Sequence, residues 1–245
     1  GGFITTHLAW QDCFYFYLFY GVFILFISSL LPETLITKNY HALKFKRLVS
    51  SYLHAFSTPK LVLFSAIYGF AAAFIYVIAS GAPFTGIKII GLTSSHYGIL
   101  LLVPYCGQFF GSLFSGKFSK VLSGYQVMFV GYAVTTIGSI IMLLSFYFHY
   151  LSSLTLFVPM FFIMLGLPMI YSTTTVLAMS TYEDKATGSA VMSFITMFIA
   201  LLGAFVLTVL PQKVIVMPSI FILLIVIGFT LFYIAKHFYS DKHTT

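Results

Sequence analysis

The chain has 245 residues, of which 60% are hydrophobic and 7% charged, and its mean hydropathy is +1.03. Soluble domains carry about 25% charged residues, so a water-covered globular surface is excluded. The net charge of +7 does not indicate nucleic acid, because the basic residues lie at the ends of apolar runs, where they set topology and contact anionic lipid headgroups. We therefore expect an all-α, polytopic transmembrane helical bundle whose partner is the lipid bilayer.

Seven apolar segments are long enough to cross the bilayer, whose hydrocarbon core of about 30 Å needs about 20 helical residues. They cover residues 10–31, 60–80, 97–116, 125–148, 152–178, 188–210 and 214–235. Pro32 and Glu33 end the first span, because proline cannot continue the helix and a carboxylate belongs in water. After the second span, near Pro83, we expect an external loop over residues 81–96.

The segment 33–59 is the longest soluble stretch in the chain. Apolar and basic residues alternate within it: Leu43, Phe45, Leu48, Val49, Tyr52 and Leu53 with Lys44, Lys46 and Arg47. This mixture is typical of a helix that lies on the cytoplasmic membrane surface. We favour a linker helix over a docking site for a regulatory protein.

Small residues recur every four positions in two of the spans. They are Ser65, Gly69 and Ala73 in the second span and Gly107, Gly111 and Ser115 in the third. Such stripes let two helix backbones approach closely. We expect them to serve helix packing, with a flexible hinge as the alternative.

Ionisable groups are almost absent from the spans. Asp12 lies about one turn inside the external end of the first span. It is either a proton-coupling or cation-binding residue, or a carboxylate that stabilises the helix N-terminus, and we favour the second. Glu183 and Asp184 sit in a tight turn, where solvated charges are commoner than catalytic ones. Cys13 and Cys106 have no ligand motif around them, so no metal or disulfide is expected.

The sequence contains no metal-hydrolase, nucleophile-elbow, phosphate-loop or dinucleotide-binding motif, so it does not indicate an enzyme. We expect neither catalytic residues nor a cofactor. The spans instead hold aromatic and hydroxyl groups that suit a lipophilic substrate, neutral or cationic, through stacking and cation–π contacts. The candidate substrate-binding residues are Tyr68, Tyr76, Tyr105, Gln108 and Thr174. Gln108 is the sharpest, because an amide near mid-membrane needs a partner.

The first span carries motifs at both ends, Trp10-Gln11-Asp12 and Leu31-Pro32-Glu33-Thr34-Leu35. They resemble the sixth helix of drug:proton antiporters of the major facilitator superfamily, in particular the Bcr/CflA drug-resistance branch, although Gln11 replaces the family's arginine. Further stretches are similar to the family's later loops and helix starts: 80–84, 91–93 and 97–98 after helix seven, 107–124 between helices eight and nine, and 186–190 at helix eleven.

The resemblance implies that the seven spans are helices 6–12 of a twelve-helix carrier. It divides the chain into the end of helix five and helix six (1–31), a cytoplasmic central loop (32–59), a carboxyl-terminal six-helix half (60–235) and a cytoplasmic tail (236–245). It also implies a proton-coupled efflux carrier for drugs or other small lipophilic compounds in a bacterial inner membrane. The start at Gly1-Gly2 leads us to expect a chain that lacks the amino-terminal half and does not transport alone.

Three other readings remain open. A carrier of the same superfamily for a sugar, organic acid or peptide is the first, although anionic substrates usually need a cation inside the cavity. A non-transporting membrane remnant is the second. A seven-helix receptor is the third, and the family motifs argue against it.

The basic residues sort between alternate loops. Ten of the twelve lie on one side of the expected topology and only Lys88 and Lys213 on the other. By the positive-inside rule, the amino end is external, and the central loop and carboxyl tail are cytoplasmic.

Single cysteines introduced at Lys46 and His243, in a variant without the native cysteines, test this topology. We expect an impermeant thiol reagent to label neither position in intact cells and both after permeabilisation, because both lie on the positive side. Labelling of either one from outside would reverse the orientation.

Overall fold

The computed structural model describes residues 9–32, 45–180, 182–211 and 213–239. Its regular elements within these ranges are helices, namely α2 (Asp12–Ser29), α3 (Phe45–Phe56), α4 (Pro59–Pro83), the π-helix η1 (Phe84–Ile89), α5 (Ser94–Leu100), α6 (Leu102–Phe118), α7 (Gly124–Tyr147), α8 (Ser153–Met179), α9 (Lys185–Val209) and α10 (Val216–Tyr239). Gly1-Gly2, most of the motif after Leu31, Leu43, Lys44 and the end of the expected tail lie outside the described residues.

Seven of the helical segments in the described ranges are long and apolar enough to cross a membrane. The prediction of an all-α bundle with seven spans is therefore confirmed. Most expected boundaries lie within a few residues of the observed ones, because the length of an apolar run is set by the bilayer and is legible in the sequence.

The expected external loop over residues 81–96 is wrong. The second span continues as the π-helix η1, so that Pro59–Ile89 forms 31 helical residues. Pro83 lacks the N–H of a regular helix, and the chain after it changes to wider π-turns, with the Ile90 N–H donating to the Thr85 carbonyl at 2.9 Å. The reversal falls instead at Gly91, whose φ of +81° is one that glycine adopts without strain.

The third span is also interrupted, at Leu101, where α5 ends and α6 begins. Pro104 accounts for the break, because it cannot donate to the carbonyl four residues earlier, that of Leu100. The Thr93 side chain caps α5 by accepting the His96 N–H at 3.2 Å.

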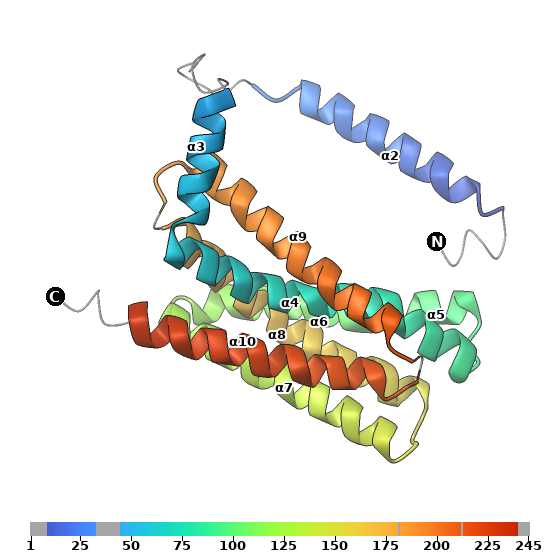
Figure 1. Ribbon diagram of the computed structural model, residues 1–245. Coiled ribbons are helices and arrows are strands. Elements are labelled where there is room, and N and C mark those ends of the chain that lie inside the picture. Colours follow the sequence, from blue (N-terminus) through green and yellow to red (C-terminus); the bar gives the residue numbers. More distant parts are fainter. Residues whose placement is uncertain (1–8, 33–44, 181, 212, 240–245) are drawn as a thin grey trace.

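Helices α4 to α10 pack into one bundle with an internal symmetry (Figure 1). α4 packs against α9 and α10, and α8 packs in the same way against α6 and α7; α4 also contacts α8, and α7 contacts α10. If α4 is exchanged with α8, α6 with α9 and α7 with α10, the same set of contacting pairs is obtained. Because three crossings separate α4 from α8, the two helices run in opposite directions, so the bundle consists of two triplets with inverted topology.

Backbone-to-backbone contact holds α6 against α8. A Cβ atom added at Gly107 would meet the carbonyl oxygen of Phe161, and one added at Gly111 would meet that of Leu165. On α4, a Cβ at Gly69 would lie 2.9 Å from the Ile199 side chain of α9. The packing role predicted for the small-residue stripes is confirmed at these glycines.

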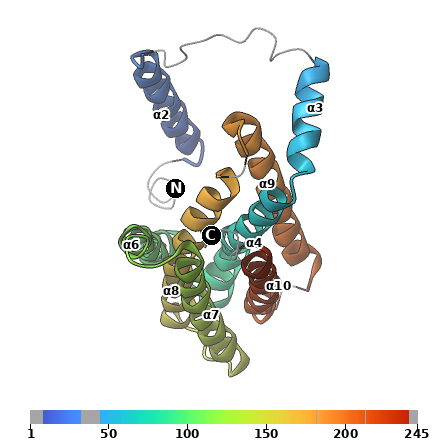
Figure 2. The same ribbon diagram turned by 90° about the vertical axis from the view of Figure 1, so that its left-hand side faces the viewer.

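Two helices lie outside the bundle. α3 runs across the ends of α4 and α9 and is tied there by the Tyr182 hydroxyl, which donates to the Ser51 carbonyl at 3.2 Å (Figure 1). This confirms the predicted helix in the central segment over Phe45–Phe56. α2 stands apart from the bundle in both views (Figures 1 and 2), and none of its side chains is buried.

Gly111→Ala should lower the free energy of unfolding by about 1–3 kcal/mol, because the methyl group would force α6 away from the α8 backbone. Gly116→Ala is the matched control on the same helix, since a Cβ there would have no atom within 4 Å. Unfolding by SDS titration in detergent measures both. Equal stability of the two variants would show that the α6–α8 approach is not required.

Candidate functional site

An open groove of about 490 Å³ lies between α6 and α8. α6 contributes Gln108 and Ser112, one helical turn apart, and α8 contributes Pro168, Tyr171, Ser172, Thr175 and Val176. A volume of this size lies within the range of small-molecule sites. The close α6–α8 approach at Gly107 and Gly111 brings the two polar rows side by side.

Two polar groups in this groove have no hydrogen-bond partner among the described residues. The two serines of the groove have partners. The Ser112 hydroxyl donates to the Gln108 carbonyl at 3.0 Å, and the Ser172 hydroxyl oxygen lies 2.5 Å from that of Ser115. The Gln108 side-chain amide and the Thr175 hydroxyl make no such bond and line the open groove. A ligand, a water molecule or another protein surface has to satisfy them in a membrane.

Tyr171 is fixed at the inner side of the groove by α4. Its hydroxyl donates to the Ala71 carbonyl at 3.1 Å, and its ring lies 4.7 Å from that of Tyr68, centre to centre. The two rings meet at an angle of 32°. Tyr171 therefore gives the groove a rigid aromatic wall, because its phenol is held by α4 at both the ring and the hydroxyl.

The remaining predicted substrate residues lie in different surroundings. Tyr76 is 38% exposed, and its hydroxyl lies 3.2 Å from the Met197 sulfur of α9. Tyr105 is 56% exposed and lies one turn before Gln108 on α6. Thr174 is fully buried, and its hydroxyl donates to the Ile170 carbonyl of its own helix at 2.6 Å. Of the five, the structure thus places Gln108 in the groove and Tyr68 directly behind it.

Asp12 stands on α2, outside the bundle that contains this groove. Its carboxylate accepts the Ala9 N–H at 2.9 Å, and the residue stands in the first turn of that helix. A carboxylate at this position is stabilised by the helix dipole. The geometry is that of a helix-end residue, and the proton-coupling role remains a prediction.

Charged side chains in the turn Glu183–Lys185 bond to the ends of the helices on either side of it. The Asp184 carboxylate caps α9 by accepting bonds from the Thr187 hydroxyl and N–H, which lowers the pKa of Asp184 below its usual value. The Lys185 ammonium donates to the carbonyl groups of Met179, the last residue of α8, and of Tyr182 in the turn. These contacts join α8 to α9 across the turn.

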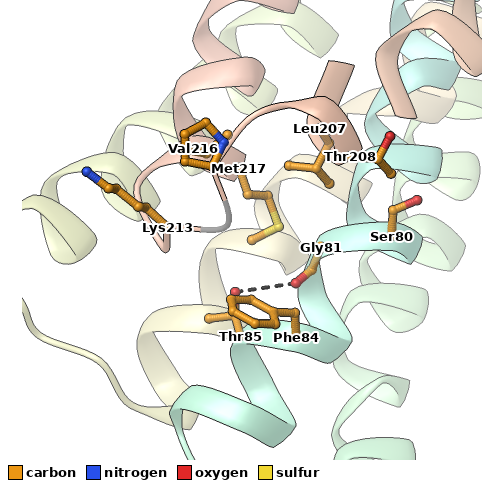
Figure 3. A pocket seen from close by; sticks show the side chains of 10 residues that line it. Ser80, Gly81, Phe84, Thr85, Leu207, Thr208, Lys213, Val216 and Met217 are labelled. Atoms are coloured by element: carbon orange, nitrogen blue, oxygen red, sulfur yellow. Dashed lines mark hydrogen bonds between the residues drawn. The ribbon is translucent and has the colours of Figure 1, made fainter. Parts of the chain in front are cut away.

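A small cavity at the carboxyl-terminal end of α4 cannot hold a drug-sized ligand. Figure 3 shows Ser80, Gly81 and Thr85 on one side and Leu207 and Met217 on the other. Its volume is about 50 Å³, whereas ligand pockets measure about 300–1,000 Å³. The Thr85 hydroxyl donates to the Gly81 carbonyl at 3.3 Å and supports the start of η1 instead.

Sequence reasoning missed Ser112 and Ser172 as groove residues. The signal that identifies them is spacing: Ser112 follows Gln108 by four residues, and Ser172 and Thr175 follow Pro168 by four and seven. Residues with these separations share one helix face. The described part of the chain contains no cluster of three or more residues able to hold a metal ion.

No protein-family model matches the chain, and no curated protein matches its sequence significantly.

Proposed function

We propose that this chain supplies one half of a proton-coupled secondary transporter of the major facilitator type, which exports drugs or other small lipophilic compounds. The observation that carries the proposal is the inverted pairing of the α4–α7 and α8–α10 triplets. Secondary transporters are built from such inverted repeats, and they bind substrate at the repeat interface near the bilayer midplane. The groove between α6 and α8 lies at the interface between the two triplets.

The chemistry of the groove supports a neutral or cationic lipophilic substrate. Its lining holds the aromatic ring of Tyr171, the unpaired amide of Gln108 and the hydroxyl of Thr175, and no charged side chain. An organic acid would need a cation to replace its hydration. Apolar contact, stacking and one or two hydrogen bonds fit a drug-like molecule.

The isolation of α2 supports a missing partner surface. A membrane-spanning helix that buries none of its side chains against its own chain has to be covered by lipid or by another protein. In the proposed carrier, α2 is helix six and packs within the amino-terminal half. The exposed groove is then closed by that half from the other side.

The 245-residue chain expressed alone, in cells without their own drug exporters, should give no dye efflux above background. In the proposed carrier, substrate is moved by the rocking of two halves against each other, and this chain supplies only one of them. Ethidium efflux with and without an uncoupler measures this.

In a second experiment the chain is fused to the amino-terminal half of a major facilitator carrier. We expect this joined carrier to show uncoupler-sensitive efflux. Uncoupler-sensitive efflux by the isolated chain would refute the half-carrier and make Asp12 the first proton-site candidate. Failure of every joined carrier that reaches the membrane would support a remnant without transport activity.

In the joined carrier, Gln108→Leu should change the efflux of two chemically unlike drugs by different factors while membrane abundance stays near normal. The reason is that the unpaired amide faces the groove rather than a neighbouring helix. Thr230→Val on α10 is the control, since its hydroxyl donates to the Val226 carbonyl of its own helix at 2.7 Å. If the amide instead joins helices, about 0.6–2 kcal/mol of stability is lost, and both drugs fall equally with abundance.

A further inference from the structure

A second open groove, also of about 490 Å³, runs between α7 and α10 at the end of the bundle where α7 begins and α10 ends. The residues that line it on the α7 side are Leu122, Ser123, Tyr125, Gln126, Phe129 and Val130, and on the α10 side Phe232 and Lys236. It shares no lining residue with the groove between α6 and α8.

The deep part of this groove is apolar and aromatic. The Phe232 ring lies 6.5 Å from the rings of both Phe129 and Tyr125, and Phe129 is 50% exposed. Phe232 is only 3% exposed and forms the floor, whereas Phe129 and Val130 form an outward-facing wall between two membrane-spanning helices. Such a surface accepts a hydrocarbon chain, because each buried methylene group is worth about 0.8 kcal/mol.

The mouth of the groove is positively charged. Lys236 is exposed, and its ammonium makes no ion pair within the described part of the chain. The Ser123 and Gln126 side chains satisfy one another's backbone N–H groups at 2.9 and 3.4 Å, which fixes the start of α7 beside this lysine. No carboxylate lines the groove, so the charge is uncompensated.

The surroundings raise the same charge further. Lys60, at the start of α4, lies 5.6 Å from the centre of the Tyr239 ring on α10, on the same side of the bundle as Lys236. The opposite end carries only Lys88 and Lys213 among the lysines of the described residues. The groove therefore opens on the basic side, where anionic lipids are drawn to a protein surface.

We propose that the α7–α10 groove is a binding site for an anionic phospholipid, with the phosphate at Lys236 and one acyl chain along Phe129, Val130 and Phe232. A lipid is the occupant because one molecule must combine a negative headgroup with an apolar chain, at a surface that faces the bilayer. The proposal rests on the membrane-spanning character of α7 and α10 and not on transport.

Native mass spectrometry of the purified chain in detergent tests the site with phosphatidylglycerol and phosphatidylcholine of identical acyl chains. We expect the wild type to prefer phosphatidylglycerol and Lys236→Gln to lose about fivefold of that preference, since one lysine near the surface contributes about that factor. Lys117→Gln is the matched control, because Lys117 also stands in the last turn of a spanning helix at this end but does not line the groove. Lys236→Arg should keep the preference.

An unchanged preference in Lys236→Gln, or an equal loss in Lys117→Gln, would overturn the site. A second measurement avoids changing the lysine. A photoreactive residue at Val130, inside the groove, should crosslink phosphatidylglycerol in excess over phosphatidylcholine, whereas one at Ile137, exposed on the same helix outside it, should crosslink both alike. Equal crosslinking of both lipids at Val130 would refute the proposal. Competition by glycerol 3-phosphate alone would show that a free phosphate ester suffices, and would also refute it.

Discussion

Every feature of this bundle depends on how closely two helix backbones can approach in an environment that gives no hydrophobic drive for helix association. Gly107 and Gly111 place the α6 backbone against the carbonyl groups of α8, and Gly131 and Gly166 do the same for α7 and α8, with a Cβ at Gly131 only 2.8 Å from the Gly166 carbonyl oxygen. α8 is thus held tightly on two sides. α4 packs against α8 as well, and the face of α8 that carries Ser172 and Thr175 lines the groove.

The same environment explains why the candidate site contains so few free polar groups. Most buried hydroxyl groups donate to a carbonyl of their own helix, as at Ser65, Thr135, Ser139 and Thr173. A hydroxyl satisfied in this way has little left to offer a ligand. Outside the groove, the buried hydroxyls of Tyr132 and Thr196 also lack a partner among the described residues. Within the groove, the unpaired Gln108 amide and Thr175 hydroxyl are more informative about a binding surface than the total number of polar residues.

The sequence predicted the class and the number of spans because apolar length and charge position are set by the bilayer directly. It failed where a local rule was overridden by the surroundings. Gly81 and Pro83 are typical of a turn, yet the helix continues past them because π-turns and the Thr85 hydroxyl accommodate the proline. Thr174 was expected to face a ligand, but its direction is set by how α8 packs against its neighbours, and that packing depends on glycines of α6, α7 and α8 together.

The continuation of α4 into η1 has a mechanical consequence. Its 31 helical residues measure about 46 Å at 1.5 Å per residue, well beyond the thickness of the hydrocarbon layer. Lys88 stands in the last turn of η1, so the length of the helix carries its charge toward the headgroup region without a loop. Thr85 and Gly86 of η1 are buried, and a Cβ at Gly86 would lie 2.7 Å from the Tyr97 ring of α5. A tilt of α4 must therefore carry the start of the third span with it.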